Sequence, residues 1–244
     1  KGNHEIFNFL LTQGPPEIDN YLFHGSRITT VTIPSSIKTI GREAFSRCYN
    51  LSQIIFENPS SLIKIKEYAF LRCESIIKIT LPPSLVSIEA WAFHECENLS
   101  EILISSSVKS IGDFAFYNCT SLKNVSFENP SSLELIGQNA FDYCISLVQI
   151  SIPSSVLRIE KNAFMNCSNL SKLSFESPSS IYFIGNQAFR FCLELSEIQI
   201  PSSVKSIGGK VFSKFSKKKK ISFENLSSIE SFGEHFFCNY NFLT

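Results

Sequence analysis

The 244-residue sequence predicts an α/β solenoid, in which short coils of similar sequence stack on one another. Three observations support this fold class. A phenylalanine, usually preceded by alanine, recurs along the chain, its spacing takes only two values, and the same residue types surround each copy. A fixed period of a few tens of residues is the signature of repeat architectures. One such unit cannot bury its own apolar side chains, so neighbouring units must stack.

The recurring phenylalanines lie 23 or 25 residues apart, with successive intervals of 25, 23, 23, 25, 23, 25, 23 and 25. They are Phe45, Phe70, Phe93, Phe116, Phe141, Phe164, Phe189, Phe212 and Phe237. Two lengths that nearly alternate over nine copies indicate one repeated structural unit with a short and a long form.

Each coil first predicts a strand and then a turn. After Phe141, apolar residues follow at Leu147, Ile150 and Ile152, and this alternation of β-branched residues is typical of a strand. A Pro-Ser-Ser turn then ends the strand, as at 153–155, while the long coils carry Phe-Glu-Asn-Pro-Ser-Ser, as at 127–132. Strands of successive coils should align in parallel, about 4.8 Å apart.

The Ala-Phe-x-x-Cys segment of each coil predicts one short helical or 3₁₀ turn. Ala163 and Cys167, for example, lie four residues apart, which would place both on one face of a helical turn. A helical side is wider than a strand, so we expect curvature with the parallel sheet on the concave face and the helical turns on the convex face.

The repeat as it stands around Phe164 runs Ile-Pro-Ser-Ser-Val from 152 to 156, Ile159, Ala163, Phe164, Cys167 and Leu170. This motif resembles that of the BspA-like leucine-rich-repeat proteins of bacteria and mucosal protists, from about Ile28 to the end of the chain. The resemblance implies a leucine-rich-repeat horseshoe. Members of that family are surface antigens and adhesins, some of which bind host matrix proteins.

The two ends depart from the repeat. Residues 1–27 are interpreted as an N-terminal cap with a degenerate first coil, in which Tyr21-Leu22 stands in place of Ala-Phe. Residues 28–244 are the solenoid, decayed in its last two coils, where Phe215 replaces the cysteine and Lys218 takes the buried leucine position. An unpaired buried ammonium is costly, so we expect this coil to open locally.

The chain has eight cysteines, and seven share one position of the coil. They are Cys48, Cys73, Cys96, Cys119, Cys144, Cys167 and Cys192; Cys238 is off-register. Three interpretations remain open: small buried core thiols, disulfides between neighbouring coils, or zinc ligands. Zinc requires four converging ligands, usually at paired short spacings, and no such pairs occur. The core interpretation is favoured, and no metal or cofactor is expected.

Composition indicates little specific chemistry. Lys+Arg and Asp+Glu are both 22, which gives no charge asymmetry that favours nucleic acid, and no apolar run reaches the length of a transmembrane segment. The four histidines fall in unrelated positions, and no nucleophile–base constellation is apparent. The sequence therefore predicts a protein that is not an enzyme.

Solenoids commonly bind ligands on their strand face, so the outward strand positions are the candidate binding residues. They are Gln53, Ile55, Lys78, Thr80, Glu101, Leu103, Asn124, Gln149, Lys172 and Glu197. Ile55 and Leu103 are apolar and flank Thr80, which indicates an apolar contact area.

A lysine cluster is a second candidate site. Lys214, Lys217, Lys219 and Lys220 lie in a stretch without acidic residues, which indicates a site for polyanions. The alternative is sequence drift in a decaying repeat.

The predicted function is a cell-surface or secreted adhesin or antigen that binds a protein or glycan. The alternative is a cytoplasmic protein-interaction scaffold, and self-association through the solenoid ends is a further expectation. Seven glycosylation sequons fit secretion, although the Asn-Leu-Ser repeats arise from the repeat template itself.

Overall fold

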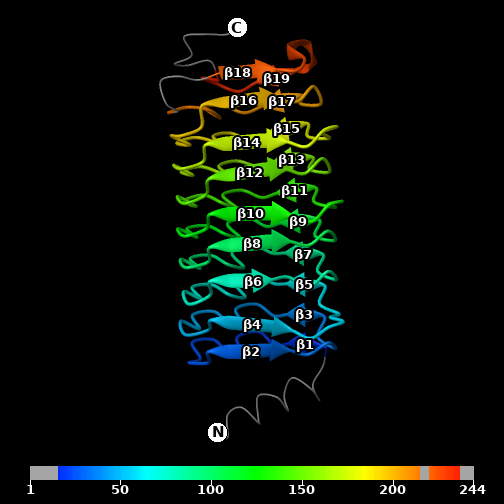
Figure 1. The fold of residues 1–244 in the computed structure, drawn as a ribbon, viewed down its shortest axis with the longest axis vertical. Coiled ribbons are helices and arrows are strands. Elements are labelled where there is room, and N and C mark those ends of the chain that lie inside the picture. Colours follow the sequence, from blue (N-terminus) through cyan, green and yellow to red (C-terminus); the bar gives the residue numbers. More distant parts are fainter. Residues whose placement is uncertain (1–15, 215–219, 237–244) are drawn as a thin grey trace, which may run out of the picture.

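The computed structural model describes residues 16–214 and 220–236, which form one stack of parallel coils (Figure 1). Each coil contributes one longer strand and one two-residue strand, so parallel sheets run along two sides of the stack. The predicted solenoid of parallel strands is confirmed.

The longer strands are β2 (Thr30–Ile33), β4 (Gln53–Phe56), β6 (Lys78–Thr80), β8 (Glu101–Ile104), β10 (Asn124–Phe127), β12 (Gln149–Ile152), β14 (Lys172–Phe175), β16 (Glu197–Ile200) and β18 (Lys220–Phe223). The two-residue strands are β1 (Glu17–Ile18), β3 (Thr39–Ile40), β5 (Lys64–Ile65), β7 (Ser87–Ile88), β9 (Ser110–Ile111), β11 (Leu135–Ile136), β13 (Arg158–Ile159), β15 (Phe183–Ile184), β17 (Ser206–Ile207) and β19 (Ser231–Phe232). The 3₁₀ helix η1 (Leu226–Ser228) lies between β18 and β19.

The core is a column of side chains repeated from coil to coil. Phe141 is fully buried and stacks on Phe116 and Phe164, with 5.2 Å between ring centroids on either side. The seven cysteines at the shared position are fully buried free thiols. The core interpretation of the cysteines is confirmed, and the recurring phenylalanines form a continuous stack in the core.

The predicted helical turns are wrong, and so is the α/β class. Around Phe141 the residues two before and two after, Asn139 and Tyr143, adopt φ of 54° and 61°. Their N–H groups, like that of Phe141, donate to carbonyls of the next coil, while the N–H groups between them donate three residues back. A right-handed helix cannot contain such alternation. The Ala-x-x-x-Cys spacing is instead met by a chain of turns.

This side of the solenoid, here called the turn face, is therefore hydrogen-bonded from coil to coil like a sheet. The predicted horseshoe curvature required a wider helical side, and in the described residues the only helical element is η1. The fold is a parallel β-solenoid of leucine-rich-repeat type with almost no helix.

The first coil also corrects one alignment. Phe23, not Leu22, occupies the phenylalanine position: its ring stacks on Phe45 at 5.1 Å, whereas Leu22 is 37% exposed. The pairing of Glu17–Ile18 with Thr39–Ile40 continues the sheet of two-residue strands into this coil. The cap predicted for the N-terminal residues lies largely outside the described part of the chain.

The two sets of strands differ in continuity. All ten two-residue strands form one sheet, but the longer strands separate between β4 and β6 and between β14 and β16. Between β10 and β12 a single residue pair remains, Asn124 with Gln149. These are the three described steps of 25 residues between equivalent strand positions, whereas every 23-residue step keeps three or four pairs.

The long turns explain why the longer strand of a long coil stays paired with the preceding coil but separates from the following one. In the long coil of β10, the Glu128 carboxylate accepts a hydrogen bond from the Ser106 N–H of the preceding coil at 2.9 Å. Glu57 and Glu176 accept equivalent bonds from Ser35 and Ser154. Each long coil is thus bound to the coil before it, and its strand separates from the coil after it.

Candidate functional site

The ten predicted binding residues lie on one surface, the outward side of the longer strands, here called the β face. Gln149 of β12, for example, pairs in register with Lys172 of β14, and both are exposed. Nine of the ten are exposed, and Glu101 is half-buried. They form two rows along the solenoid, one at the first strand position and one at the third.

Charges on the β face are paired at one end of the first row and unpaired at the other. The Lys78 ammonium lies 2.5 Å from the Glu101 carboxylate. Among the described residues, no ion pair joins Lys172 or Glu197 to an opposite charge. The later coils therefore present charges that remain available to a ligand.

The apolar part of the β face is larger than the sequence indicated. Ile55 and Leu103 are 41% and 40% exposed, and Thr80 pairs in register with Leu103. Ile77, immediately before β6, is 61% exposed and was missed, because the strand pattern gives no reason for it to face outward. It lies at the step where β4 and β6 separate.

The β face is hollowed at the other open step. A groove of about 610 Å³ lies along β14, β16 and β18, and we call it the seam groove. Its polar lining includes Lys172, Ser174, Glu197, Gln199, Lys220 and Ser222. Three of these, Lys172, Glu197 and Lys220, are candidate residues from the sequence, but the groove itself depends on strand separation that no local motif encodes.

The lysine cluster is divided by the fold. Lys214 is exposed at the end of the last described turn before residue 215, whereas Lys220 is the first residue of β18 on the β face. Lys217 and Lys219 lie outside the described residues, as does Lys218. The polyanion site therefore stays a prediction.

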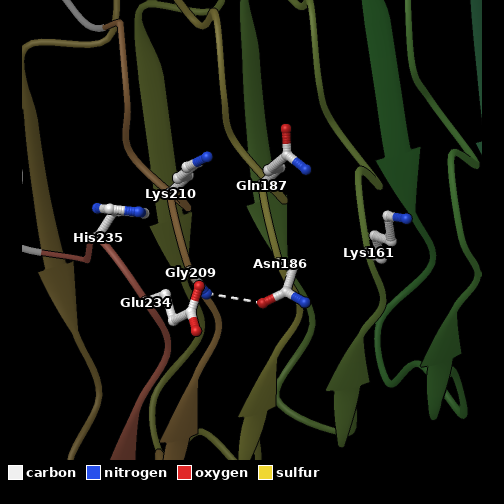
Figure 2. A pocket seen from close by; sticks show the side chains of 7 residues that line it. All are labelled: Lys161, Asn186, Gln187, Gly209, Lys210, Glu234 and His235. Atoms are coloured by element: carbon white, nitrogen blue, oxygen red, sulfur yellow. Dashed lines mark hydrogen bonds between the residues drawn. The ribbon is translucent and has the colours of Figure 1, made fainter.

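A polar hollow of about 430 Å³ lies on the turn face of the last coils (Figure 2). Lys161, Gln187, Lys210 and His235 line it, and the Asn186 side chain accepts a hydrogen bond from the Gly209 N–H at 2.7 Å. Gly209 is required here, because a Cβ would lie 2.4 Å from the Glu234 carbonyl oxygen. The hollow contains both signs of charge and no convergent catalytic group.

The family model for the BspA type leucine-rich-repeat region matches this chain in six copies, over residues 16–134 and 125–244. The chain belongs to this family.

Solved structures support the same assignment for the BspA-type chain. A leucine-rich-repeat protein from Bacteroides ovatus is 31% identical, with a TM-score of 0.69 over 89% of this chain and 58% of that one. One from Eubacterium ventriosum is 25% identical, with a TM-score of 0.64 and coverages of 82% and 62%. The Treponema pallidum leucine-rich-repeat protein is 28% identical, with a TM-score of 0.53 and coverages of 73% and 71%.

This BspA-type chain spans less than two thirds of the Bacteroides and Eubacterium proteins. Among curated proteins, none matches it significantly. The comparisons thus establish the repeat family.

The cysteines of this BspA-type repeat are structural donors. Each thiol donates to the carbonyl of a phenylalanine in an earlier coil; Cys144, for instance, lies 3.3 Å from the Phe116 carbonyl oxygen. Burial raises the pKa of Cys48 to about 11 and that of Cys96 to about 12. Thiols with such pKa values are not nucleophiles at neutral pH.

Two other buried titratable groups lie on the turn face. His94 contacts Glu95 at 3.1 Å, and burial lowers its pKa. Burial raises the pKa of Asp142 to about 6, although Asn139 and Asn166 donate to its carboxylate at 2.6 and 2.9 Å. Over the described ranges, no three His, Cys, Asp or Glu side chains converge as metal ligands.

An aromatic row on the turn face was missed by sequence analysis. Trp91 stacks between Tyr68 and Phe114, with ring centroids 5.6 and 4.1 Å apart. All three have φ near 60°, which is unfavourable for bulky residues. The available signal was an aromatic residue two positions before Phe70, Phe93 and Phe116.

Within the described part, no helix could span a lipid bilayer.

Proposed function

We propose that this chain is a non-enzymatic binding module that recognises a protein or glycan through the β face. The observation that supports the proposal is the outward display of the ten predicted residues along the longer strands, over a continuous buried apolar core. Binding surfaces built on rigid elements retain affinity because little conformational entropy is lost on association.

The experiment is a binding screen of the purified chain against matrix proteins and glycans, followed by two matched variants of one coil. Gln149→Arg adds a long cation to the β face, and Gln138→Arg adds the same side chain to the turn face. Binding lost only in the first variant supports the β face. Equal loss, or no loss, in the two variants contradicts it.

We further propose that the chain acts at a cell surface or outside the cell, as the repeat's resemblance to surface antigens suggests. Seven free cysteines favour the alternative of a cytoplasmic scaffold, because thiols persist in reducing compartments. Labelling intact cells with an antibody against the chain separates the two. Signal only after permeabilisation would contradict surface display.

A further inference from the structure

Phe183 is an aromatic side chain that faces outward from the sheet of two-residue strands. It is half-buried in β15, where the following residue, Ile184, belongs to the core. The Arg158 guanidinium carbon lies 4.3 Å from the centre of the Phe183 ring, so one face of the ring is covered. Arg158 is itself held in place, because its Nε donates to the Glu160 carboxylate at 2.7 Å. Phe183 is thus a well-positioned surface ring with one face occupied.

The other face of the Phe183 ring has no comparable partner. On the next strand, Phe183 pairs in register with Ser206, whose side chain is too short to cover a phenyl ring. The Ser206 hydroxyl accepts a hydrogen bond from the Ser231 hydroxyl, one strand further, at 2.8 Å. Within the described residues, no second ring or cation contacts Phe183. An aromatic face bordered by hydroxyl groups is therefore presented to solvent.

Glycines separate Phe183 from the polar hollow on the turn face. Gly185, Gly208 and Gly233 occupy the same position on three successive coils. A Cβ at any of them would collide with main-chain atoms of the preceding coil, so packing alone requires glycine here. As a result, no side chain of this segment rises between Phe183 and Asn186, three residues and about 10 Å further along an extended chain.

The hollow beyond the glycines offers hydrogen-bonding groups of both charge signs (Figure 2). Among the described residues, Lys161, Lys210 and Glu234 form no ion pair. The side-chain oxygen of Asn186 is used by the Gly209 N–H, which leaves the amide nitrogen as a donor. Unpaired donors beside an unpaired carboxylate are matched better by hydroxyl groups, which both donate and accept, than by an ion of one sign.

We propose that the surface formed by Phe183, the three glycines and the hollow, here called the glycine corner, binds a neutral glycan of hexose units. One sugar ring stacks its C–H face on the open face of Phe183. The next ring lies over the glycines, donates hydroxyl hydrogen bonds to Glu234 and accepts them from Lys210. Ligand sites combine apolar surface with a few placed polar groups in this way.

The ligand class follows from the charges and from the flat path between the two halves of the site. An anionic glycan would be repelled by the Glu234 carboxylate, so the neutral class is favoured. A sugar ring can lie directly on the glycines because no side chain covers them. The glycine corner lies outside the β face, so this inference goes beyond the proposed function and does not depend on it.

The test titrates the chain with neutral tetrasaccharides of glucose, galactose, mannose and N-acetylglucosamine, each as a separate probe. Amide NMR spectra give the dissociation constant and, from the resonances that shift, the location of the bound sugar. At least one probe should bind, with the largest shifts at Gly185, Gly208 and Gly209. Saturation transfer from the protein should be strongest to the sugar C–H protons that face the ring.

Each variant introduces a residue that the same position holds in another coil, so the fold should persist, as circular dichroism can verify. Phe183→Ser copies Ser206 and should weaken binding by about fivefold or more, because a stacking surface is lost. Lys210→Gln copies Gln187 and should weaken it by about threefold or more, because a charged donor is lost. The matched control is Leu135→Ser, which removes an apolar side chain from the same row two strands earlier and should bind like the parent.

Four outcomes overturn the proposal. The first is that none of the neutral probes binds at millimolar concentration. The second is that Phe183→Ser binds as tightly as the parent, or no more weakly than Leu135→Ser. The third is that the shifts are confined to β12 and β14, which would place the sugar on the β face. The fourth is that a heparin tetrasaccharide binds more tightly than every neutral probe, which would make the ligand an anion. Gln149→Arg, the β-face variant, should leave the affinities unchanged, so the two proposals can fail separately.

Discussion

The two strand ladders of this solenoid respond differently to the same change in repeat length. The two-residue strands pair without interruption from β1 to β19, whereas the longer strands separate at β4–β6 and β14–β16. The two extra residues of a long coil lie in the turn between the two ladders, as in 127–132. The turn is hydrogen-bonded to the preceding coil through Glu128. The strand before the two extra residues therefore keeps its pairing with the preceding coil and loses pairing only with the following coil.

This comparison shows that a solenoid can vary one face while the rest of each coil stays fixed. The turn face and the short-strand ladder set the stacking distance, and the stacked phenylalanines fill the space between coils. On the β face, neighbouring longer strands can then pair at 23-residue steps and separate at 25-residue steps. A groove lies at the open step between β14 and β16, and exposed isoleucines lie at the open step between β4 and β6.

The largest expected effect comes from the core that supports both ladders. Phe141→Ala should destabilise the chain by about 3–5 kcal/mol, the cost of removing a fully buried aromatic ring. Urea unfolding followed by circular dichroism measures it. The half-buried Phe127, at the end of β10, is the comparison: Phe127→Ala should cost clearly less. A loss below about 1 kcal/mol for Phe141→Ala would contradict the packing described here.

The next effect tests what binds a long turn to the preceding coil. Glu128→Ala removes the acceptor of the Ser106 N–H and should cost about 1.5–3 kcal/mol, the range for hydrogen bonds to charged groups. Hydrogen exchange should accelerate in β8 and β10. Glu134→Ala, an exposed position of the same coil, is the control and should change stability by less than about 0.5 kcal/mol. Equal effects would mean that the carboxylate does not position the turn.

The third effect is the pH dependence of the turn face. Because folding raises the pKa of Asp142 to about 6 from 3.8, the folded state binds this proton more tightly than the unfolded state. The contribution to stability is full below about pH 4 and is lost as the pH rises through 6. Its size should be about 1–2 kcal/mol, a two-unit shift reduced for partial hydration.

Asp142→Asn removes this titration. Thermal unfolding of the parent and the variant between pH 4 and 7 should therefore diverge, with the variant flatter across that window. Parallel curves would show that Asp142 does not titrate differently in the two states.

The smallest effect for a single interaction concerns the ladder comparison itself. Deleting Asn129 and Pro130 turns the 25-residue step after β10 into a 23-residue step, so β10 and β12 should pair over their full length. Each regained hydrogen bond should contribute about 0.5–1.5 kcal/mol, and the amides of β12 should exchange more slowly. The reciprocal variant inserts Asn-Pro after Pro153 and should expose the amides of β14. Unchanged amide exchange rates in both variants would show that repeat length does not control whether neighbouring longer strands pair.

Much of the architecture was predictable from the sequence because the repeat averages over many coils. The anchor phenylalanines, the buried cysteines and the inward strand residues were each supported by seven or more copies, and the structure confirms those that lie in its described residues, which exclude Phe237. The turn conformation was mispredicted because Ala-x-x-x-Cys spacing fits both one helical turn and a chain of turns. Only φ and the direction of the N–H groups distinguish them.

Part of the candidate site was likewise predictable from the sequence, and part was not. The outward residues Gln149, Lys172 and Glu197 followed from the alternation of the strand, which local sequence encodes. The separation of β14 from β16 could not be predicted from local sequence. It depends on a hydrogen bond between a turn in one coil and a residue of another coil, 22 residues away in sequence.

The sequence by itself determined the repeat, its two lengths, the parallel stacking and the identity of the core. Periodic burial is written directly into residue spacing, since every coil faces the same environment. Only the tertiary structure decided which strands pair, which charges remain unpaired and where the β face is hollowed. These properties arise from hydrogen bonds and ion pairs between coils, and each depends on the relative position of two segments that no single repeat contains.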